Sequence, residues 1–388
     1  MRIVHWYPSF LRGGGVANAV VRLANAQALL GLEPVIVAAE APSAALYGAP
    51  EIGAGVELVE WRPAWSMGRG GIVLHGVPSQ AARRLRAQAP DVLHVHGEFN
   101  PDNWWAPRLW DAPLLLSPHG AFHPPVARSR WVSGKSVYVC LARRLLYRHV
   151  GALHAVSPLE REHLTAAFPG VDIDCVPHGP SIGVGGCRAR ADPSPRGRRS
   201  PVRFVFVGRL DVVAKGLDLL LAAYAAALPQ LPERGVTLTL IGPDWNGGRA
   251  MLEQRARTLD IAERISLTGA VPGAEVERLL CDCDGYVQLS RHEAFGFGVA
   301  DALIAGKPVI TTTTTGVASF PELARLPQLR VVRPKVEEAV RAMVEVTRRI
   351  EELGAAAEAT RHEVQRFLSW ERVAAAHRKT YERLRSAA

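Results

Sequence analysis

Residues 202–216 read VRFVFVGRLDVVAKG and predict the fold of the second half of the chain. Val202–Val207 is apolar except for one arginine, which is the pattern of a strand buried in a parallel sheet. A turn that contains Gly208 follows the strand, and the apolar stretch Leu217–Leu228 predicts a helix shortly after it. We therefore interpret this stretch as the first strand and helix of an α/β domain.

The first residues of the chain, MRIVHWYPSFLRGGG, show the same order. A buried strand over Met1–Tyr7 leads through Gly13–Gly15 to a helix over Ala17–Leu30. Elsewhere short apolar runs alternate with helical patterns, which is typical of two doubly wound parallel sheets. Further buried strands are predicted at Pro34–Ala38, Val92–Val95, Leu114–Ser117, Ala152–Val156, Thr237–Ile241, Tyr286–Leu289 and Pro308–Thr312. Such sheets bind ligands at the carboxyl ends of their strands, so the loops that follow these strands should carry the chemistry.

A segment between the two halves predicts the domain boundary. Residues 183–201, GVGGCRARADPSPRGRRSP, are rich in Gly, Pro and Arg and have no apolar periodicity, which favours an exposed linker. This places an N-terminal domain at 1–182 and a C-terminal domain at 202–365. Residues 366–388 predict a basic amphipathic helix.

The composition limits the class of protein. The chain has 388 residues, of which 48% are hydrophobic and 21% charged, so it can fold around full cores. The longest apolar stretch, Leu219–Leu228, is far shorter than the ~20 residues of a membrane-spanning helix, and no signal peptide is predicted. Five cysteines, an odd number without C-x-x-C spacing, favour reduced thiols in the cytoplasm.

The net charge of +9 is compatible with an anionic partner. Nucleotide phosphates, an anionic lipid surface and nucleic acid all meet this condition. No RNA- or DNA-binding motif is present, so nucleic acid is not expected as a partner.

Two cations follow the strand of the opening stretch. Arg209 stands at its end, and Lys215 lies six residues later, at the start of the predicted helix. An arginine can grip phosphate oxygens with two hydrogen bonds, and a lysine adds a point charge beside the helix N-terminus. The pair therefore suits a diphosphate, although two solvated surface cations would show the same spacing.

Acidic and glycine-rich residues follow the strand Tyr286–Leu289. Glu293 lies in the loop, where a carboxylate can accept hydrogen bonds from sugar hydroxyls. Phe295-Gly296-Phe297 leads into a helix, whose first N–H groups can face an anion. Asp301 lies in the first turn of that helix, where a negative charge is favourable without any ligand.

Four further motifs have a structural alternative. Gly13–Gly15 allows close approach of a ligand, or forms an ordinary turn. His94 and His96 could bind a metal, although a structural role is favoured. Trp104, Trp105 and Trp110 could stack on an acceptor sugar or pack in the core. Residues 128–149 are basic and amphipathic, which suits an anionic membrane or a helix packed on its own domain.

Two D-x-D motifs, Asp172–Asp174 and Asp282–Asp284, each lead into a predicted strand. A metal site would be expected after a strand, so no metal site is predicted at either motif.

Several motifs stand in a fixed order along nearly the whole chain. They are Gly14 with its neighbours, Ser117-Pro118-His119-Gly120, Ala155-Val156-Ser157, Val176-Pro177-His178-Gly179, Gly208–Gly216, Leu267-Thr268-Gly269 and Glu293–Pro308. This ordered set resembles the group 1 family of retaining, nucleotide-sugar-dependent glycosyltransferases with the GT-B fold. Residues 91–164 further resemble bacterial members that build exopolysaccharides.

The resemblance implies a fold and a set of roles. Two Rossmann-like domains would face each other across a cleft, with the acceptor on the N-terminal domain, the nucleotide sugar on the C-terminal domain, and the final helix returning to the N-terminal domain. The donor would need no metal. The implied catalytic residues are Arg209 and Lys215 on the diphosphate, Glu293 on the sugar hydroxyls and His119 near the reaction centre. The implied donor-binding residues are Gly14, Gly15, Gly208, Gly269, Val271, Phe295, Gly296, Phe297 and Asp301.

The sequence departs from the family at three positions. Asp301 stands where the family has a second glutamate for the ribose, and it is shorter by one methylene. Residues 311–317, TTTTTGV, replace the usual Gly-Gly loop, which puts the contact of that loop with the phosphates in doubt. His178 stands where asparagine is common, and we interpret it as a loop variation.

The sequence thus predicts a cytoplasmic, retaining glycosyltransferase that moves a sugar from a nucleotide diphosphate to a glycan acceptor. A lipid-linked glycan is one form of that acceptor, and it would place the enzyme at the inner face of the membrane. A phosphorylase, or a nucleotide-sugar hydrolase or epimerase, is the alternative within the same fold. A non-catalytic basic module that binds nucleic acid or membrane is a remote third interpretation.

Overall fold

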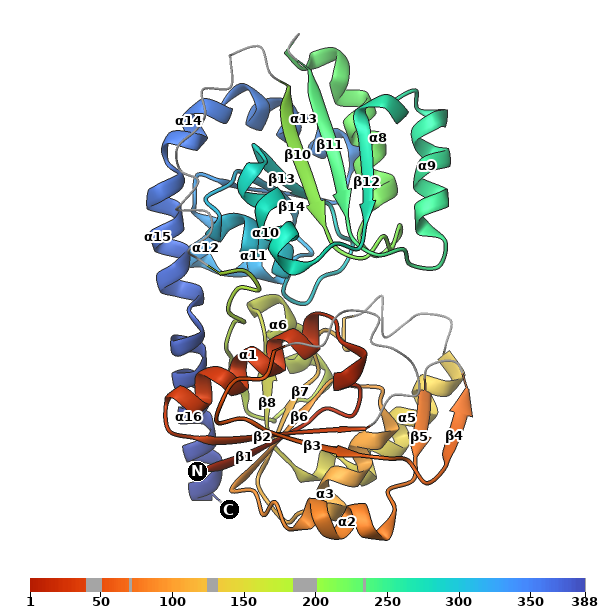
Figure 1. Ribbon diagram of the computed structural model, residues 1–388, viewed down its shortest axis with the longest axis vertical. Helices are drawn as coiled ribbons and strands as arrows, with labels where there is room; N and C mark the ends of the chain where they lie inside the picture. The colour runs from red at the N-terminus through yellow and green to blue at the C-terminus, as the bar shows by residue number, and fades with distance from the viewer. Residues whose placement is uncertain (40–50, 70–71, 124–131, 184–200, 233–234, 388) are drawn as a thin grey trace. The chain divides into compact units, whose positions relative to one another are not determined.

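The computed structural model describes residues 1–39, 51–69, 72–123, 132–183, 201–232 and 235–387 (Figure 1). They form two compact units, each built on a parallel sheet. One unit comprises Met1–Gly179 together with Ser369–Ala388, and the other comprises Pro180–Leu368. The predicted linker, residues 183–201, lies almost wholly outside the described residues.

The first unit contains a seven-stranded sheet in the order β3-β2-β1-β6-β7-β8-β9, and every neighbouring pair is parallel. Its strands are β1 (Arg2–Trp6), β2 (Glu33–Ala39), β3 (Glu57–Trp61), β6 (Val92–His96), β7 (Leu114–Ser117), β8 (Val150–Ala155) and β9 (Ile173–Cys175). The register places His5 of β1 beside His94 of β6. Strands β4 (Ser66–Arg69) and β5 (Ile72–His75) form a separate antiparallel pair.

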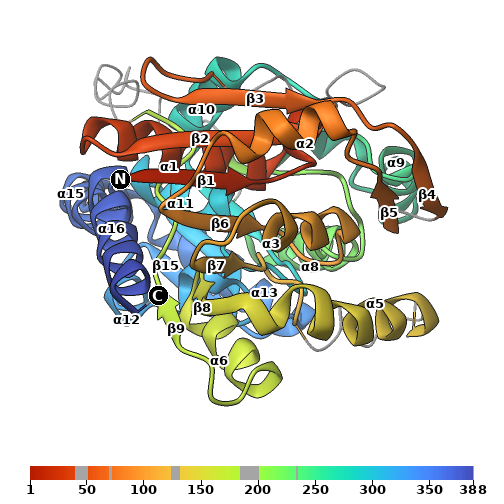
Figure 2. The same ribbon diagram turned by 90° about the horizontal axis from the view of Figure 1, so that it is seen from below.

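Helices cover this sheet, and the last of them comes from the end of the chain. They are α1 (Gly15–Leu29), α2 (Ser79–Arg86), α3 (Ala106–Leu109), α5 (Val132–Leu145), α6 (Pro158–Ala167) and α16 (Trp370–Ala387). Helix α16 lies beside α1 in both Figure 1 and Figure 2. Tyr381 and Leu384 of α16 pack on Ile3, Val92 and Leu115 of the sheet, so α16 completes the core of the first unit.

The second unit contains a six-stranded parallel sheet in the order β12-β11-β10-β13-β14-β15. Its strands are β10 (Val202–Val207), β11 (Val236–Ile241), β12 (Ile265–Gly269), β13 (Gly285–Gln288), β14 (Val309–Thr312) and β15 (Leu329–Val332). Its helices are α8 (Leu217–Ala227), α9 (Gly248–Thr258), α10 (Gly273–Asp282), α11 (Phe297–Ile304), α12 (Pro321–Ala324), α13 (Val336–Arg348), α14 (Ile350–Ala355) and α15 (Ala357–Leu368).

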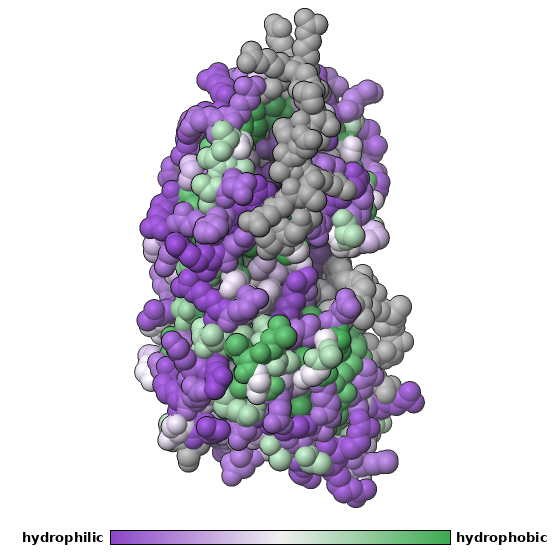
Figure 3. Space-filling model, turned by 60° about the vertical axis from the view of Figure 1, so that its left-hand side comes forward, coloured by the Kyte–Doolittle hydropathy of each residue, from purple (hydrophilic) through white to green (hydrophobic). Residues whose placement is uncertain are grey.

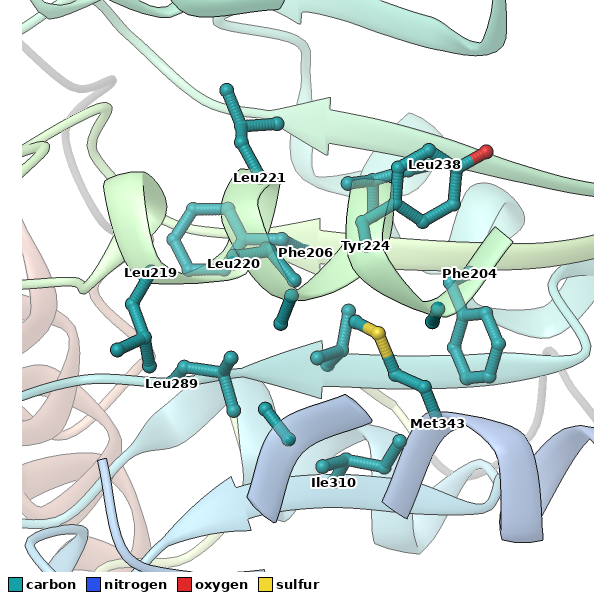
Figure 4. Close-up of a cluster of buried hydrophobic side chains, with 14 of the residues drawn as sticks. Phe204, Phe206, Leu219, Leu220, Leu221, Tyr224, Leu238, Leu289, Ile310 and Met343 are labelled. Carbon is teal, nitrogen blue, oxygen red and sulfur yellow. The ribbon is translucent and has the colours of Figure 1, made fainter. Parts of the chain in front are cut away.

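The opening stretch of the second unit behaves as its sequence predicts. Phe204 and Phe206 of β10 are buried, and they belong to one apolar cluster with Leu220 and Tyr224 of α8 and Met343 of α13 (Figure 4). Apolar side chains on the strand meet the apolar face of the helices, which stabilises this layer by roughly 1.5–3 kcal/mol per large side chain. The predicted α/β class, the two parallel sheets and the returning C-terminal helix are confirmed.

Two expectations need correction. The C-terminal helix begins at Trp370 and not at residue 366, because α15 ends at Leu368 and the Ser369 hydroxyl caps the next helix by accepting from Arg372 N. The expectation that all cysteines are reduced is wrong for Cys281, which forms a disulfide. Cys140, Cys175 and Cys283 are free thiols.

Hydrophilic side chains cover most of the face shown in Figure 3, and hydrophobic ones gather there in smaller patches. Among the helices of the described residues, none has a stretch long and apolar enough to cross a bilayer.

Candidate functional site

The strand order of the second unit reverses direction beside β10. The chain runs from β10 outward to β12, then returns to β13 on the other side of β10 and continues outward to β15. Such a switch point leaves a crevice at the carboxyl ends of the two central strands. Arg209 and Lys215 follow β10, and Glu293 follows β13, so three of the four predicted catalytic residues flank the switch point.

Lys215 and Glu293 form an ion pair across the switch point. The Lys215 Nζ contacts Glu293 Oε2, and Gln288 Nε2 donates to the same oxygen at 3.2 Å. Each side chain of the ion pair keeps less than a fifth of its surface exposed, 17% for Lys215 and 19% for Glu293. The result is one cation and one carboxylate in fixed positions at the same edge of the sheet.

Arg209 lies over the ring of Trp245, with its guanidinium carbon 4.2 Å from the ring centroid. Trp245 belongs to the loop after β11, which is joined to the Arg209 loop by a hydrogen bond from Leu210 N to Pro243 O at 2.9 Å. In the part of the chain that the structure describes, no carboxylate forms an ion pair with Arg209. Its positive charge is therefore available to an anion.

Removal of the Trp245 ring should release Arg209 from its fixed position. We expect Trp245→Leu to weaken the affinity for a nucleotide diphosphate about 2- to 30-fold, because a cation–π contact contributes about 0.5–2 kcal/mol. Calorimetric titration of both proteins measures this change. Trp245→Phe retains an aromatic face and should lose less, whereas equal losses for Leu and Phe would contradict the role of the ring.

Gly216 lets the two central loops approach each other. Its φ is +61°, and a Cβ at this position would lie 2.0 Å from the carbonyl oxygen of Leu289, at the end of the neighbouring strand. A side chain cannot occupy that space, so the turn that carries Lys215 requires glycine. Gly216 is also the N-cap of α8, and this places Lys215 directly before the first turn of the helix.

The loop that carries Glu293 is joined to the loop after β14. Glu293 N donates to Thr314 O at 3.1 Å, and Gly316 N donates to Glu293 O at 2.9 Å. The hydroxyls of Thr312 and Thr314 both donate to Ser290 O, at 2.6 and 2.7 Å. The threonine run that replaces the glycine pair of the family therefore fixes the Glu293 loop through side-chain hydrogen bonds.

The remaining predicted residues of the second unit lie around the same edge. Gly296 is the N-cap of α11, Phe295 is buried, and Phe297 begins the helix and is partly exposed. Gly208 N donates to Ile241 O at 2.9 Å, and Gly242 N donates to Gly269 O at 3.0 Å, so these loops run side by side. Val271 follows β12 and is partly exposed.

Asp301 is buried, and its side chain accepts hydrogen bonds from backbone groups. Its Oδ1 lies 2.7 Å from Ser181 N and 3.4 Å from Ile182 N, at the beginning of the second unit. The ribose role that the resemblance implies stays a prediction. The observed contacts give Asp301 a structural role in addition.

Loss of the Asp301 carboxylate should destabilise the protein. Asp301→Ala leaves two backbone N–H groups without this acceptor, which costs about 1–3 kcal/mol for a buried group. Asp301→Asn keeps an acceptor oxygen and should retain most of that stability. Denaturant unfolding followed by circular dichroism compares the two variants, and an unchanged midpoint for Asp301→Ala would exclude the structural role.

The other predicted residues belong to the first unit. Gly14, with φ +93°, caps α1, and Gly15 is the first residue of that helix. His119 follows β7 with φ +53°, and the loop is held by Glu160, whose carboxylate accepts from Gly120 N and from Val156 N. Burial lowers the pKa of His119 to about 3 and raises the pKa of Glu160 to about 7. His119 is therefore neutral at physiological pH.

His119 contacts two other histidines. Its Nε2 lies 3.3 Å from His96 Nδ1, and its ring stacks on His178 with centroids 5.4 Å apart. The replacement of asparagine by histidine at position 178 therefore places a ring on the face of His119.

Trp110 and the two D-x-D motifs make structural contacts. Trp110 is buried and donates from Nε1 to Leu85 O, so it packs in the core. Asp174 accepts from Thr380 and Arg383 of α16, and Asp284 accepts from Arg203 N. Both D-x-D motifs contribute such structural contacts within their units.

Two family models match the chain, one on each unit. Residues 201–349 match the model described as glycosyl transferases group 1, and residues 14–179 match the glycosyl transferase 4-like domain. The chain belongs to the group 1 glycosyltransferase family. This confirms the family that the ordered motifs indicated.

The chain is similar to a curated relative in sequence and to two solved structures in fold. Glycogen synthase from Mycobacterium tuberculosis is 27% identical over 266 residues, which are 66% of this chain and 60% of that protein. The chain thus spans about 60% of the length of the curated relatives it matches first. Sucrose-phosphate synthase from Thermosynechococcus elongatus has the same fold, with a TM-score of 0.74 at 16% identity over 100% of both chains. HepE from Anabaena, solved with UDP and glucose, has a TM-score of 0.71 at 16% identity over 99% of this chain and 100% of its own.

Proposed function

We propose that this protein is a retaining glycosyltransferase that moves a sugar from a nucleotide diphosphate to a glycan acceptor. One observation carries the proposal: a fixed Lys215–Glu293 pair lies at the switch point with Arg209, a cation that pairs with no carboxylate of the described residues, on the same loop as Lys215. Cations suit the two phosphates, and a carboxylate suits the hydroxyls of the attached sugar. Membership of the group 1 family supports the same assignment.

The geometry suggests how the transfer proceeds. Cleavage of the bond between sugar and phosphate develops positive charge on the sugar and negative charge on the departing phosphate. Arg209 and Lys215 stabilise that negative charge, aided by the N–H groups at the start of α8. Retention follows most simply from attack on the face that the phosphate leaves, with the phosphate oxygen taking the proton of the acceptor hydroxyl.

Binding of nucleotides tests the donor site. HepE was solved with UDP and glucose, so UDP and UDP-glucose are the first compounds to titrate, followed by GDP and its conjugates. We expect one nucleotide to bind in the presence of EDTA, since the proposed site needs no metal. Anomeric proton couplings of the product in NMR then report retention or inversion. Phosphate-dependent breakdown of a disaccharide, without transfer from a nucleotide sugar, would favour a phosphorylase instead.

A lipid-linked acceptor is supported by the surface of α5. Val137 and Leu141 are 59% and 42% exposed on this helix, and Arg143 and Arg144 follow them on its exposed side. Apolar side chains next to arginines suit the headgroup region of an anionic bilayer. Residues 128–131 of the predicted basic segment lie outside the described residues.

Reversal of charge on α5 tests this surface. We expect Arg143→Glu/Arg144→Glu to release the protein from vesicles of phosphatidylglycerol and phosphatidylcholine, because each basic residue near such a surface contributes about 1 kcal/mol. Arg255→Glu/Arg257→Glu on α9 changes the net charge equally at exposed positions and is the matched control. Equal release by both variants, or no vesicle binding by the unmodified protein, would contradict a membrane role for α5.

A further inference from the structure

The interior of the first unit contains four buried histidines on three strands. They are His5 on β1, His94 and His96 on β6, and His154 on β8, and each is at most 2% exposed. Burial lowers the pKa of His5 and of His154 to about 4 and that of His94 and His96 well below the usual value. Each ring is therefore neutral at pH 7, with one nitrogen that donates and one that accepts.

A backbone carbonyl fixes the first of these rings. His154 Nε2 lies 2.8 Å from Val176 O, which can only accept, so this nitrogen carries the proton and His154 Nδ1 accepts. Ser117 lies 2.7 Å from that Nδ1 and must donate its single hydroxyl proton to it. The Ser117 oxygen then accepts from His94 Nε2 at 2.7 Å, so His94 Nδ1 accepts from the hydroxyl of Tyr381 at 2.8 Å.

The series of hydrogen bonds continues from Tyr381 to His119. The Tyr381 oxygen accepts from Gln27 Nε2 at 2.9 Å, which leaves the Gln27 oxygen to accept from His5 Nε2 at 2.7 Å. His5 Nδ1 then accepts from His96 Nε2 at 2.9 Å. His96 Nδ1 in turn accepts from His119 Nε2 at 3.3 Å. We call this series the histidine network. Its hydrogen bonds all run in one direction, so that each donor in it faces an acceptor.

We propose that the histidine network fixes His119 as the tautomer with its proton on Nε2, so that Nδ1 is an acceptor. Tyr381, Gln27 and Ser117 are then positioning residues for His119, although they lie in the core and on α16. With the proton of His119 on Nδ1 instead, two unprotonated or two protonated nitrogens would face each other at some hydrogen bond of the network. Reversal of every ring would avoid this clash, but the unprotonated nitrogen of His154 would then face Val176 O, which is also an acceptor.

The role of the acceptor nitrogen of His119 in donor binding rests on the proposed function. A histidine near the reaction centre with an acceptor nitrogen would receive a hydrogen bond from a sugar hydroxyl rather than donate one to a phosphate oxygen. The network would thus suit His119 to the recognition of a sugar hydroxyl.

A metal ion is the competing explanation for the buried histidines. One nitrogen of each of His5, His94 and His96 lies within 4.8 Å of the others, which is compatible with three ligands. However, all six nitrogens of these rings already take part in hydrogen bonds. The rings of His94 and His96 also lie against each other, with centroids 4.0 Å apart. A metal would have to break several of these hydrogen bonds, so the network is the better account.

NMR of protein labelled with ¹⁵N-histidine tests the proposal without any substrate. We expect His154, His94, His5, His96 and His119 all to be neutral with the proton on Nε2 at pH 7. Scalar couplings across the hydrogen bonds should join His96 Nε2 to His5 Nδ1 and His119 Nε2 to His96 Nδ1. A proton on Nδ1 of His119 would overturn the proposal. Stoichiometric zinc in the purified protein, together with the absence of these couplings, would also overturn it.

Tyr381→Phe removes the hydroxyl that links His94 to Gln27, so it interrupts the series of hydrogen bonds between Val176 O and His119. We expect a mixture of tautomers at His119, His96 and His5, while His154 keeps its proton on Nε2. Ser117→Ala interrupts the network one ring earlier and should have the same effect on His119, so a folding defect in one variant does not prevent the test. His377→Phe is the matched control, because His377 is buried on the same helix and neither of its ring nitrogens has a hydrogen-bond partner among the described residues. An unchanged His119 in both interrupted variants would contradict the proposal.

Activity gives a second readout. We expect Tyr381→Phe to lower kcat for sugar transfer about 3- to 10-fold, the value of one ordinary hydrogen bond, with the Kd for the free nucleotide unchanged. If the unmodified protein shows the expected tautomers but transfers no sugar, the proposed function fails and the network stands. If it transfers sugar with His119 in the other tautomer, the network fails and the function stands.

Discussion

Arg209→Ala should lower kcat for sugar transfer by ~10²-fold or more. Arg209 is the cation at the switch point that pairs with no carboxylate in the described part of the chain, and the Trp245 ring holds it in place. Under the proposed function, its charge would be matched by the departing phosphate, where negative charge increases in the transition state. The affinity for the intact donor should fall much less than kcat, because the ground state carries less charge at the bond that breaks.

Steady-state kinetics and calorimetry of two variants decide this expectation. Arg209→Lys keeps the charge but loses the planar fork, so it should recover part of the rate. Arg255→Ala, at an exposed position on α9, controls for the loss of a positive charge from the same unit. If kcat of Arg209→Ala is within a few fold of kcat of the unmodified protein, Arg209 does not stabilise the transition state.

Glu293→Gln should lower kcat/KM for the nucleotide sugar by about 10²-fold, because hydrogen bonds to a charged group contribute about 1.5–3 kcal/mol. The free nucleotide should respond differently. Glu293 is the ion-pair partner of Lys215, and its loss frees the positive charge of Lys215 for the diphosphate. We therefore expect the nucleotide without sugar to bind equally well or more tightly.

The two ligands should therefore respond differently to the same substitution. Steady-state kinetics with the nucleotide sugar and calorimetric titration with each ligand measure the two effects. Lys215→Met is the companion variant, and it should weaken both ligands because it removes the cation itself. Equal losses of nucleotide and nucleotide sugar in Glu293→Gln would mean that the carboxylate does not bind the sugar.

The interior strands could be predicted from the sequence, whereas the edge strands β3, β12 and β15 could not. Strands such as β10 and β7 are buried and read as continuous apolar runs. The outermost strands are β3 and β9 in one sheet and β12 and β15 in the other. Residues of β12 alternate between partly buried and exposed, so this strand has no apolar run to detect. Solvent on one side of an edge strand removes the signal on which the prediction depends.

The site divides in a similar way. The positions of Arg209, Lys215 and Glu293 beside the switch point could be predicted because each residue follows a strong strand signal, and their catalytic roles stay predictions. Trp245 was missed, although it also follows a strand, since no local pattern marks a ring that stacks on an arginine of another loop. Roles that depend on a bound ligand, such as those of Gly14, Val271 and Asp301, stay predictions.

The histidine network shows a different limit of the sequence. His94 and His96 are two residues apart on one strand, which places them on the same face of the sheet. That spacing is visible in the sequence. The hydroxyl that completes their hydrogen bonds comes from Tyr381, which is 287 positions away from His94, and no local pattern connects the two.

The place of α16 has a consequence for synthesis of the protein. Most of the first unit is translated before the second unit, but its core includes Tyr381 and Leu384, which follow the second unit in the chain. The second unit lies wholly within Pro180–Leu368, so its complete sequence is available earlier. Domains generally fold as units during translation. The first unit therefore cannot complete its core until the second unit has been translated.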